Sequence, residues 1–181
     1  MSVKGDIYKT IEAHLMDNVE GLAVVDKDRG QLENISEFAM PFPAILMSYG
    51  RFEYEPIGGG LKKGTGTIQF RVAYENYADS YSGSINQDLA LQFFEFNEQV
   101  QNALEGFSSD LFSPLTLIAD EDDKDHKNII VTIFEYETTI VNKSGANDKN
   151  YIQVDATPKV RYTQKENLPK REAHNDFIID I

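Results

Sequence analysis

The sequence predicts an α+β domain with helices packed on one face of a mixed or antiparallel β-sheet. Three observations lead there: two segments with apolar residues at helical spacing, two pairs of strand-like segments joined by turns, and a length of 181 residues, which suits one domain better than two. The expected order is α-β-β-α-β-β, with an additional C-terminal strand. Residues 1–163 would form the domain, and residues 164–181 a tail that docks on its own or a neighbouring subunit.

The first helix is predicted from apolar residues that recur at helical spacing. Gly5 or Asp6 would begin this helix and Gly21 would end it. Residues 24–40 have no clear period, and Pro41 and Pro43 forbid a continuing helix, so we expect a loop with at most one short strand. The apolar residues of the predicted helix are Ile7, Tyr8, Ile11, Leu15 and Val19.

A long hairpin follows, with strands at residues 43–57 and 65–77 around a glycine-rich tip at residues 58–64. The tip is longer than a tight two-residue turn. Lys62 and Lys63 on this tip are candidates for contact with a partner. The second strand alternates, so one of its faces should pack and the other, which carries Arg71, should stay wet. The residues predicted to pack are Ile68, Phe70, Val72 and Tyr74.

Residues 86–105 form the second predicted helix, with a capping box at Ser84 and Gln87 and a terminating glycine at Gly106. Its outer face carries Leu91 and Phe94, which are either scattered exposed residues or part of a subunit contact. The residues expected to face the core are Leu89, Phe93, Phe96, Val100, Ala103, Leu104 and Phe107. The residues expected to form an acidic channel or interface face are Asp88, Glu95, Glu98 and Glu105.

The rest of the chain predicts a second hairpin and a tail. Its strands would span residues 115–119 and 128–141, around an acidic turn at 120–127. A polar loop at 143–150 would lead to an edge strand at 151–163 that contains Pro158. The tail ends in the apolar residues Phe177, Ile178 and Ile179, which we expect to contact this domain or a neighbouring chain.

Composition excludes several functional classes. The net charge of −13 opposes non-specific binding of nucleic acid, because phosphate contacts need Lys and Arg. No cysteine is present, which removes disulfides, thiolate metal sites and cysteine nucleophiles and leaves the redox compartment open. No apolar run reaches the length of about 18 residues that a membrane span needs. The N-terminus lacks the pattern of a signal peptide, so we expect a cytoplasmic protein without membrane contact.

Charge is unevenly distributed along the chain. Residues 75–125 contain twelve acids and the single base Lys124, whereas residues 159–172 contain five bases and two acids. The two segments either complement each other, within or between subunits, or are separate solvated faces.

Candidate chemical motifs are incomplete. Gly59 and Gly64 have the spacing of a phosphate-binding loop, but Thr65 stands where that motif requires Lys. The four aspartates between residues 120 and 125 lack the glycine and glutamate of a calcium loop, so a solvated turn explains them better. Glu135 and Glu137 share a strand face, which is explained by solvent exposure. The histidines at His14, His126 and His174 are isolated and expected on the surface.

We therefore expect no enzyme activity, catalytic residue, cofactor or metal. The enzyme alternative is a small carboxylate-dependent hydrolase or a nucleotide-binding domain.

The order helix, glycine-tipped hairpin, helix, hairpin over residues 3–142 resembles the tail terminator or tail-completion proteins, also called head-tail joining proteins, of long-tailed bacteriophages. The similar segments are residues 43–46, 66–77, 100–106 and 129–136. The resemblance implies a virion structural protein that forms a homohexameric ring, caps the tail tube and joins it to the head connector. Its partners would be copies of itself, the tail tube protein and the connector or neck protein.

The resemblance also implies a location in the virion tail after assembly in the host cytoplasm, and an acidic channel wall through which DNA passes without specific binding. The alternatives are a neck or head-completion protein and the cap of a contractile injection device. Two features depart from the compact family pattern: the length beyond residue 142 and the basic stretch at residues 159–171.

Overall fold

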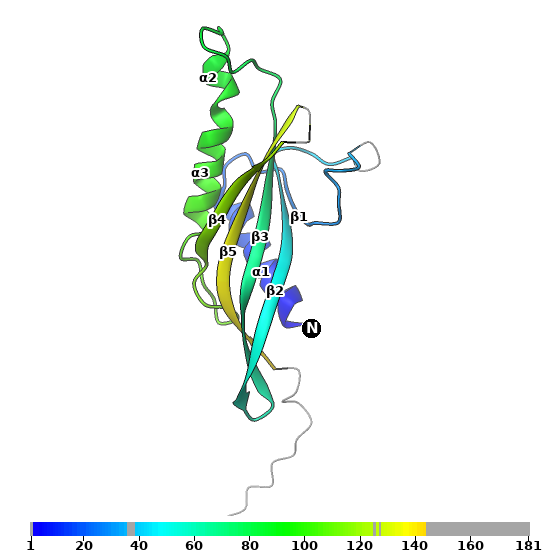
Figure 1. The fold of residues 1–181 in the computed structure, drawn as a ribbon, viewed down its shortest axis with the longest axis vertical. Coiled ribbons are helices and arrows are strands. Elements are labelled where there is room, and N and C mark those ends of the chain that lie inside the picture. Colours follow the sequence, from blue (N-terminus) through cyan, green and yellow to red (C-terminus); the bar gives the residue numbers. More distant parts are fainter. Residues whose placement is uncertain (1, 36–38, 125, 127, 144–181) are drawn as a thin grey trace, which may run out of the picture. The chain divides into compact units, whose positions relative to one another are not determined.

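The computed structural model describes residues 2–35, 39–124, 126 and 128–143 (Figure 1). The predicted strand at 151–163, the boundary at residue 163, and Phe177, Ile178 and Ile179 lie outside these described residues. Eight elements follow along the chain: α1 (Val3–Asn18), β1 (Val24–Lys27), β2 (Ala44–Gly58), β3 (Leu61–Glu75), α2 (Gln87–Ala90), α3 (Gln92–Leu104), β4 (Thr116–Asp123) and β5 (Ile129–Asn142). None of these helices is long and apolar enough to cross a membrane.

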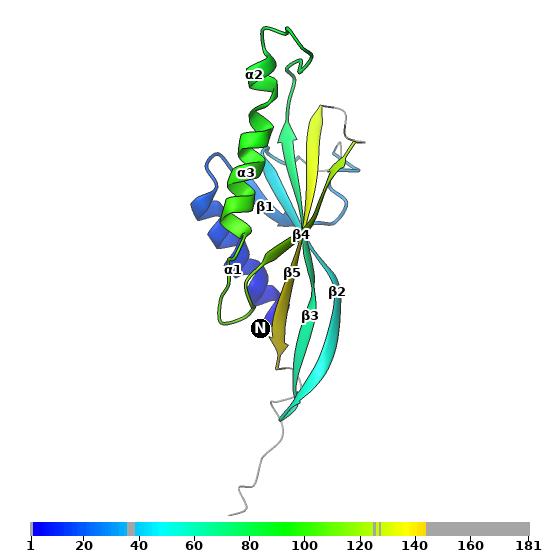
Figure 2. The same cartoon turned by 60° about the vertical axis from the view of Figure 1, so that its left-hand side comes forward.

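The strands form one five-stranded mixed sheet in the order β1-β2-β3-β5-β4. β1 pairs with β2 in parallel, and the other three pairings are antiparallel. Helices α1 and α3 lie on the same side of this sheet, as Figure 2 shows. The α+β fold class predicted from the sequence is therefore confirmed.

The main core lies between the two long helices and the sheet. Each helix presents buried apolar residues at helical spacing, which is the amphipathic pattern that the sequence predicted. On β3 the residues facing this core are Ile68, Phe70 and Val72, as expected from alternation. The buried helical residues of this core are Ile7, Ile11, Leu15, Phe96, Val100 and Leu104.

The opposite face of the sheet carries a second, smaller core, so the expectation that this face of β3 stays wet is wrong there. Ala73 on β3 and Leu46 on β2 are fully buried, and they cluster with Leu32 from the segment that follows β1. Met40 and Phe42 pack against the same cluster. The segment between β1 and β2 therefore covers part of the face that alternation alone assigns to solvent.

The tip of the long hairpin is shorter than predicted. The strands continue to Gly58 and from Leu61, which pair with each other, so the turn consists of Gly59 and Gly60. Both turn residues have positive φ, 60° and 79°, which glycine adopts without the steric penalty of a side chain.

The second predicted helix is divided in two. Leu91 has φ −94° and ψ −2° and separates α2 from α3. The N-cap of α2 is Asn86, without a side-chain hydrogen bond, and the Ser84 hydroxyl accepts from the Asn86 amide, so the predicted capping box is wrong. Because the break rotates α2 relative to the expected arc, Ala90 is buried and Leu89 is 55% exposed.

Strand β4 extends further than predicted, through the acidic residues assigned to a turn. Asp120 pairs with Phe134 of β5, and Asp123 with Val131. Asp120, Glu121 and Asp122 are exposed, so this edge strand keeps its charges in solvent. Cross-strand pairing outweighs the low strand propensity of aspartate here.

Candidate functional site

Two of the predicted contact residues, Leu91 and Phe94, lie in a segment of the chain with several exposed apolar side chains. Leu91 is 36% exposed and Phe94 is 60% exposed, in agreement with their assignment to the outer helix face. In the same stretch Ile85 is fully exposed and Leu89 is more than half exposed. We call residues 85–94 the apolar segment; it comprises the residues just before α2, all of α2 and the start of α3 (Figure 1).

Acidic residues accompany the apolar segment. All four residues assigned to the acidic face are exposed: Asp88, Glu95, Glu98 and Glu105. Glu105 also accepts a hydrogen bond from the Leu117 amide of β4 at 3.0 Å, so this carboxylate covers part of the sheet edge. No lysine or arginine occurs between Arg71 and Lys124, so the local charge is uncompensated by neighbours in sequence.

Lys62 and Lys63 lie far from the apolar segment along the sheet. Both are exposed on β3, where they pair with Asn142 and Val141 of β5. Strand β3 continues to Glu75, and the Asn76 side chain then donates to the Ala90 carbonyl oxygen at 2.9 Å. Figure 1 shows the β2–β3 turn, beside which Lys62 and Lys63 lie, and helix α2 toward opposite ends of β3.

A buried cluster of charged side chains lies on the sheet face opposite the helices, and sequence reasoning missed it. Arg71 of β3 is only 8% exposed. Its guanidinium donates to Glu33 at 2.7 Å, to Asp123 at 2.6 Å and to Asp28 at 3.4 Å. The sequence predicted a wet position for Arg71, but the loop after β1 and the end of β4 enclose it.

The loop that supplies Asp28 and Glu33 is held by its own hydrogen bonds. The buried Gln31 amide donates to Asp26 at 3.0 Å and to the Lys27 carbonyl oxygen at 2.8 Å. Gln31 also accepts from the Arg29 amide at 2.6 Å. These bonds close the loop tightly after β1, which brings its two carboxylates to the guanidinium.

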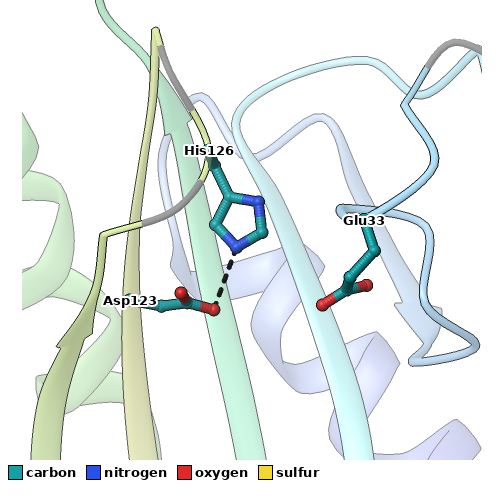
Figure 3. A group of neighbouring side chains, drawn as sticks. All are labelled: Glu33, Asp123 and His126. Carbon is teal, nitrogen blue, oxygen red and sulfur yellow. Dashed lines mark hydrogen bonds and ion pairs between the residues drawn. The ribbon is translucent and has the colours of Figure 1, made fainter.

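His126 completes the cluster, although the sequence predicted a surface position. Only 8% of it is exposed, and its Nε2 lies 2.9 Å from Asp123 and 3.2 Å from Arg71. These contacts are alternatives, because a protonated Nε2 donates to Asp123 and an unprotonated one accepts from Arg71. Figure 3 shows His126 directed toward Asp123, with Glu33 approaching from the other loop.

Within the cluster, the pKa values of Asp123 and Arg71 shift in the directions expected of ion pairs. The hydrogen bond from His126 lowers the pKa of the Asp123 carboxyl, and the bond and charge of Arg71 add to this against the opposing effect of burial. Burial alone would lower the pKa of the Arg71 guanidinium, but its bonds to Glu33 and Asp123 outweigh burial and raise it.

Glu33, Asp123 and His126 have ligand atoms close enough to hold a metal ion, all within 4.8 Å of one another. The Arg71 guanidinium already binds the Glu33 and Asp123 carboxylates and supplies the positive charge that a cation would bring. The arrangement therefore fits an internal ion-pair network that ties two loops to β3. The signal in the sequence was an arginine within an apolar strand, with acid-rich loops elsewhere in the chain.

His14 also departs from the expected surface position. Its ring stacks on Phe107 at 3.6 Å between centroids, and its Nε2 lies 2.7 Å from the Ala103 carbonyl oxygen. This histidine joins α1 to the end of α3. His174 lies outside the described residues.

No protein-family model matches this chain, and no curated protein matches it. Among solved structures, it is similar to a chain of the "Virion of native gene transfer agent (GTA) particle", with 10% sequence identity and a TM-score of 0.37. The similarity covers 78% of this chain and 92% of that chain. A TM-score below 0.5 does not establish a shared fold, so the role of that particle does not transfer to this protein.

Proposed function

We propose that this protein is a structural component of a phage-like virion, and that it is the tail terminator or tail-completion subunit that the sequence resembles. In that role its copies form a ring, expected to be a hexamer, that caps the tail tube and joins it to the head connector. The observation that carries the proposal is the apolar segment 85–94, where large apolar side chains are exposed beside acidic ones. A surface of this kind favours association with a partner.

Each exposed apolar side chain of this segment gains free energy when a neighbouring subunit covers it. Complete burial of a Leu, Ile or Phe side chain is worth about 1.5–3 kcal/mol. Since Phe94 is 60% exposed and Leu89 is 55% exposed, a subunit that covered either would gain about half of that range, or about 0.8–1.5 kcal/mol each. Burial of three or four such side chains at each contact, repeated around a closed ring, offsets part of the entropy that the subunits lose on association.

The acidic residues suit a ring through which DNA passes. Carboxylates that face solvent in the ring, such as those of Asp120, Glu121 and Asp122 on β4, repel phosphates and offer no group that would retain them. Whichever surface lines the channel, an acidic wall lets the duplex slide without specific binding. The same repulsion opposes self-association of two identical acidic faces, which favours a head-to-tail contact between subunits.

The proposal is tested by electron microscopy and light scattering of the purified protein, alone and with the tail tube protein. We expect rings, or monomers that form rings when the tube protein is added. A double variant, Leu91→Ser with Phe94→Ser, should lose assembly while keeping its fold. Met16→Ser is the matched control, because Met16 is 45% exposed on α1 and lies outside the apolar segment.

A protein that stays monomeric with the tail tube protein present would refute the proposed role. Addition of the head connector separates the finer alternatives. A ring that binds only the connector fits a neck or head-completion protein, whereas a ring that binds the tube end fits a terminator. Tube ends from a contractile injection device test the remaining alternative in the same way.

A further inference from the structure

The occupant of the apolar segment must match both its apolar side chains and its acidic ones. Leu91 and Phe94 offer apolar contact, while Asp88, Glu95 and Glu98 beside them place carboxylates at the surface. A second copy of the same segment would supply apolar contact but would bring like charges together, which is unfavourable. The complementary partner is therefore a segment that combines apolar residues with Lys and Arg.

Residues 159–179 of this chain have that composition. Five of the chain's 17 basic residues lie between residues 159 and 171, and Phe177, Ile178 and Ile179 follow shortly after. These residues lie outside the described part of the structure. Their order, basic residues followed by an apolar end, is the counterpart of an apolar segment beside an acidic helix.

In the described fold the end of β5 and the apolar segment lie toward opposite ends of β3. Asn142, the last residue of β5, pairs with Lys62 near the hairpin turn. The apolar segment lies beyond the other end of β3, where Asn76 contacts Ala90. The strand between Lys62 and Glu75 spans about 44 Å at about 3.4 Å per residue. A link from one copy to the opposite end of the next is a head-to-tail contact, the type that closes rings.

We propose that residues 159–179 of one copy bind the apolar segment of a neighbouring copy. Phe177 and Ile178 would cover Leu91 and Phe94. The bases of residues 159–171 would pair with the acids of the neighbour's α2 and α3, namely Asp88, Glu95 and Glu98. This inference rests on the proposed ring, for which it names the device that joins one subunit to the next.

The test uses cysteine cross-linking in the full chain, which has no native cysteine to interfere. Leu91→Cys and Ile178→Cys are made in separately tagged proteins, mixed and oxidised. A disulfide forms only when the two Cα atoms approach within about 7 Å, so the cross-link reports direct contact between copies. Met16→Cys with Ile178→Cys is the matched control, because Met16 is exposed on α1.

We expect the Leu91–Ile178 cross-link between copies at several-fold higher yield than the Met16 control. A triple variant, Lys165→Glu, Lys170→Glu and Arg171→Glu, should reduce that yield several-fold, and so should salt at about 1 M, which screens charge beyond about 3 Å. A yield no higher than the control overturns the inference. So does a doubly substituted chain that closes its disulfide only within one copy.

The failures of the two proposals are distinguishable. Rings seen by electron microscopy without the Leu91–Ile178 cross-link would overturn this inference and leave the proposed function standing. The cross-link without any assembly on the tail tube protein would support this contact and count against the terminator role.

Discussion

Replacing Arg71 with methionine should destabilise the protein strongly, because three carboxylates converge on its buried guanidinium. Methionine fills similar space but leaves these acids close together without a counter-charge. Removing one partner of a buried ion pair typically costs about 3–5 kcal/mol. Glu33 is 49% exposed and can turn to solvent, whereas Asp28 and Asp123 are 15% and 22% exposed, so we expect the lower end, about 3 kcal/mol.

The loss is measured by urea denaturation followed by circular dichroism, comparing wild type and Arg71→Met at neutral pH. In a thermal melt of a chain of this size, a loss of about 3 kcal/mol corresponds to a fall in Tm of roughly 6–12 °C. Glu33→Gln is the matched control and should cost less than about 1 kcal/mol, because the carboxylate it removes is half exposed. An Arg71→Met protein as stable as this control would refute the reasoning.

The same pair of proteins tests a dependence on pH. The pKa of Asp123 is lowered in the folded state, so its ion pairs stabilise the fold at pH values above the unfolded pKa of about 3.9. That contribution is lost as the pH falls through the lowered folded pKa. The difference in unfolding free energy between wild type and Arg71→Met should therefore be full at neutral pH and shrink below about pH 4. A difference that grew on acidification would contradict this linkage.

Three further substitutions test packing, each by urea denaturation. Tyr136→Phe should be neutral or stabilising by up to about 1 kcal/mol, because the buried Tyr136 hydroxyl has no hydrogen-bond partner among the described residues. Tyr49→Phe loses a 2.6 Å bond to the Lys4 carbonyl oxygen and should cost about 1 kcal/mol. The reverse order of the two stabilities would contradict this. Phe96→Ala should cost about 3–5 kcal/mol of unfolding free energy, because Phe96 is only 5% exposed. Phe94→Ala should cost less than about 1 kcal/mol, because Phe94 is 60% exposed. Equal losses would show that Phe94 is packed. Gly66→Ala should cost about 1–3 kcal/mol, because its Cβ would lie 2.3 Å from the Arg51 carbonyl oxygen, and unchanged stability would mean that the two strands separate easily.

Local periodicity predicted the scaffold because α1, α3 and the central strands present their own buried faces. Ile7, Ile11 and Leu15 mark the buried stripe of α1, and alternation on β3 separates Ile68 and Phe70 from Gln69. These patterns depend on residues a few positions apart, which a sequence displays directly. The α+β class followed from them.

The buried cluster could not be predicted in the same way, because its members are distant in sequence. Arg71 is 38 residues from Glu33 and 52 from Asp123, and neither spacing is a motif. The cluster exists because the loop after β1 folds over the sheet and β4 continues as a strand through Asp123. Both features depend on tertiary contacts that outweigh local propensity.

The break at Leu91 affects how the protein opens locally. Helix α2 is a single turn, held by the buried Ala90 and by a bond from the Asn76 side chain, whereas α3 inserts Phe96, Val100 and Leu104 into the main core. Because its buried surface is small, α2 should unfold and refold many times before α3 does. Amide hydrogen exchange would then proceed fast over residues 87–90 and slowly over 96–104. The segment proposed to meet a partner therefore includes the part of the molecule that can change conformation on binding without unfolding the core.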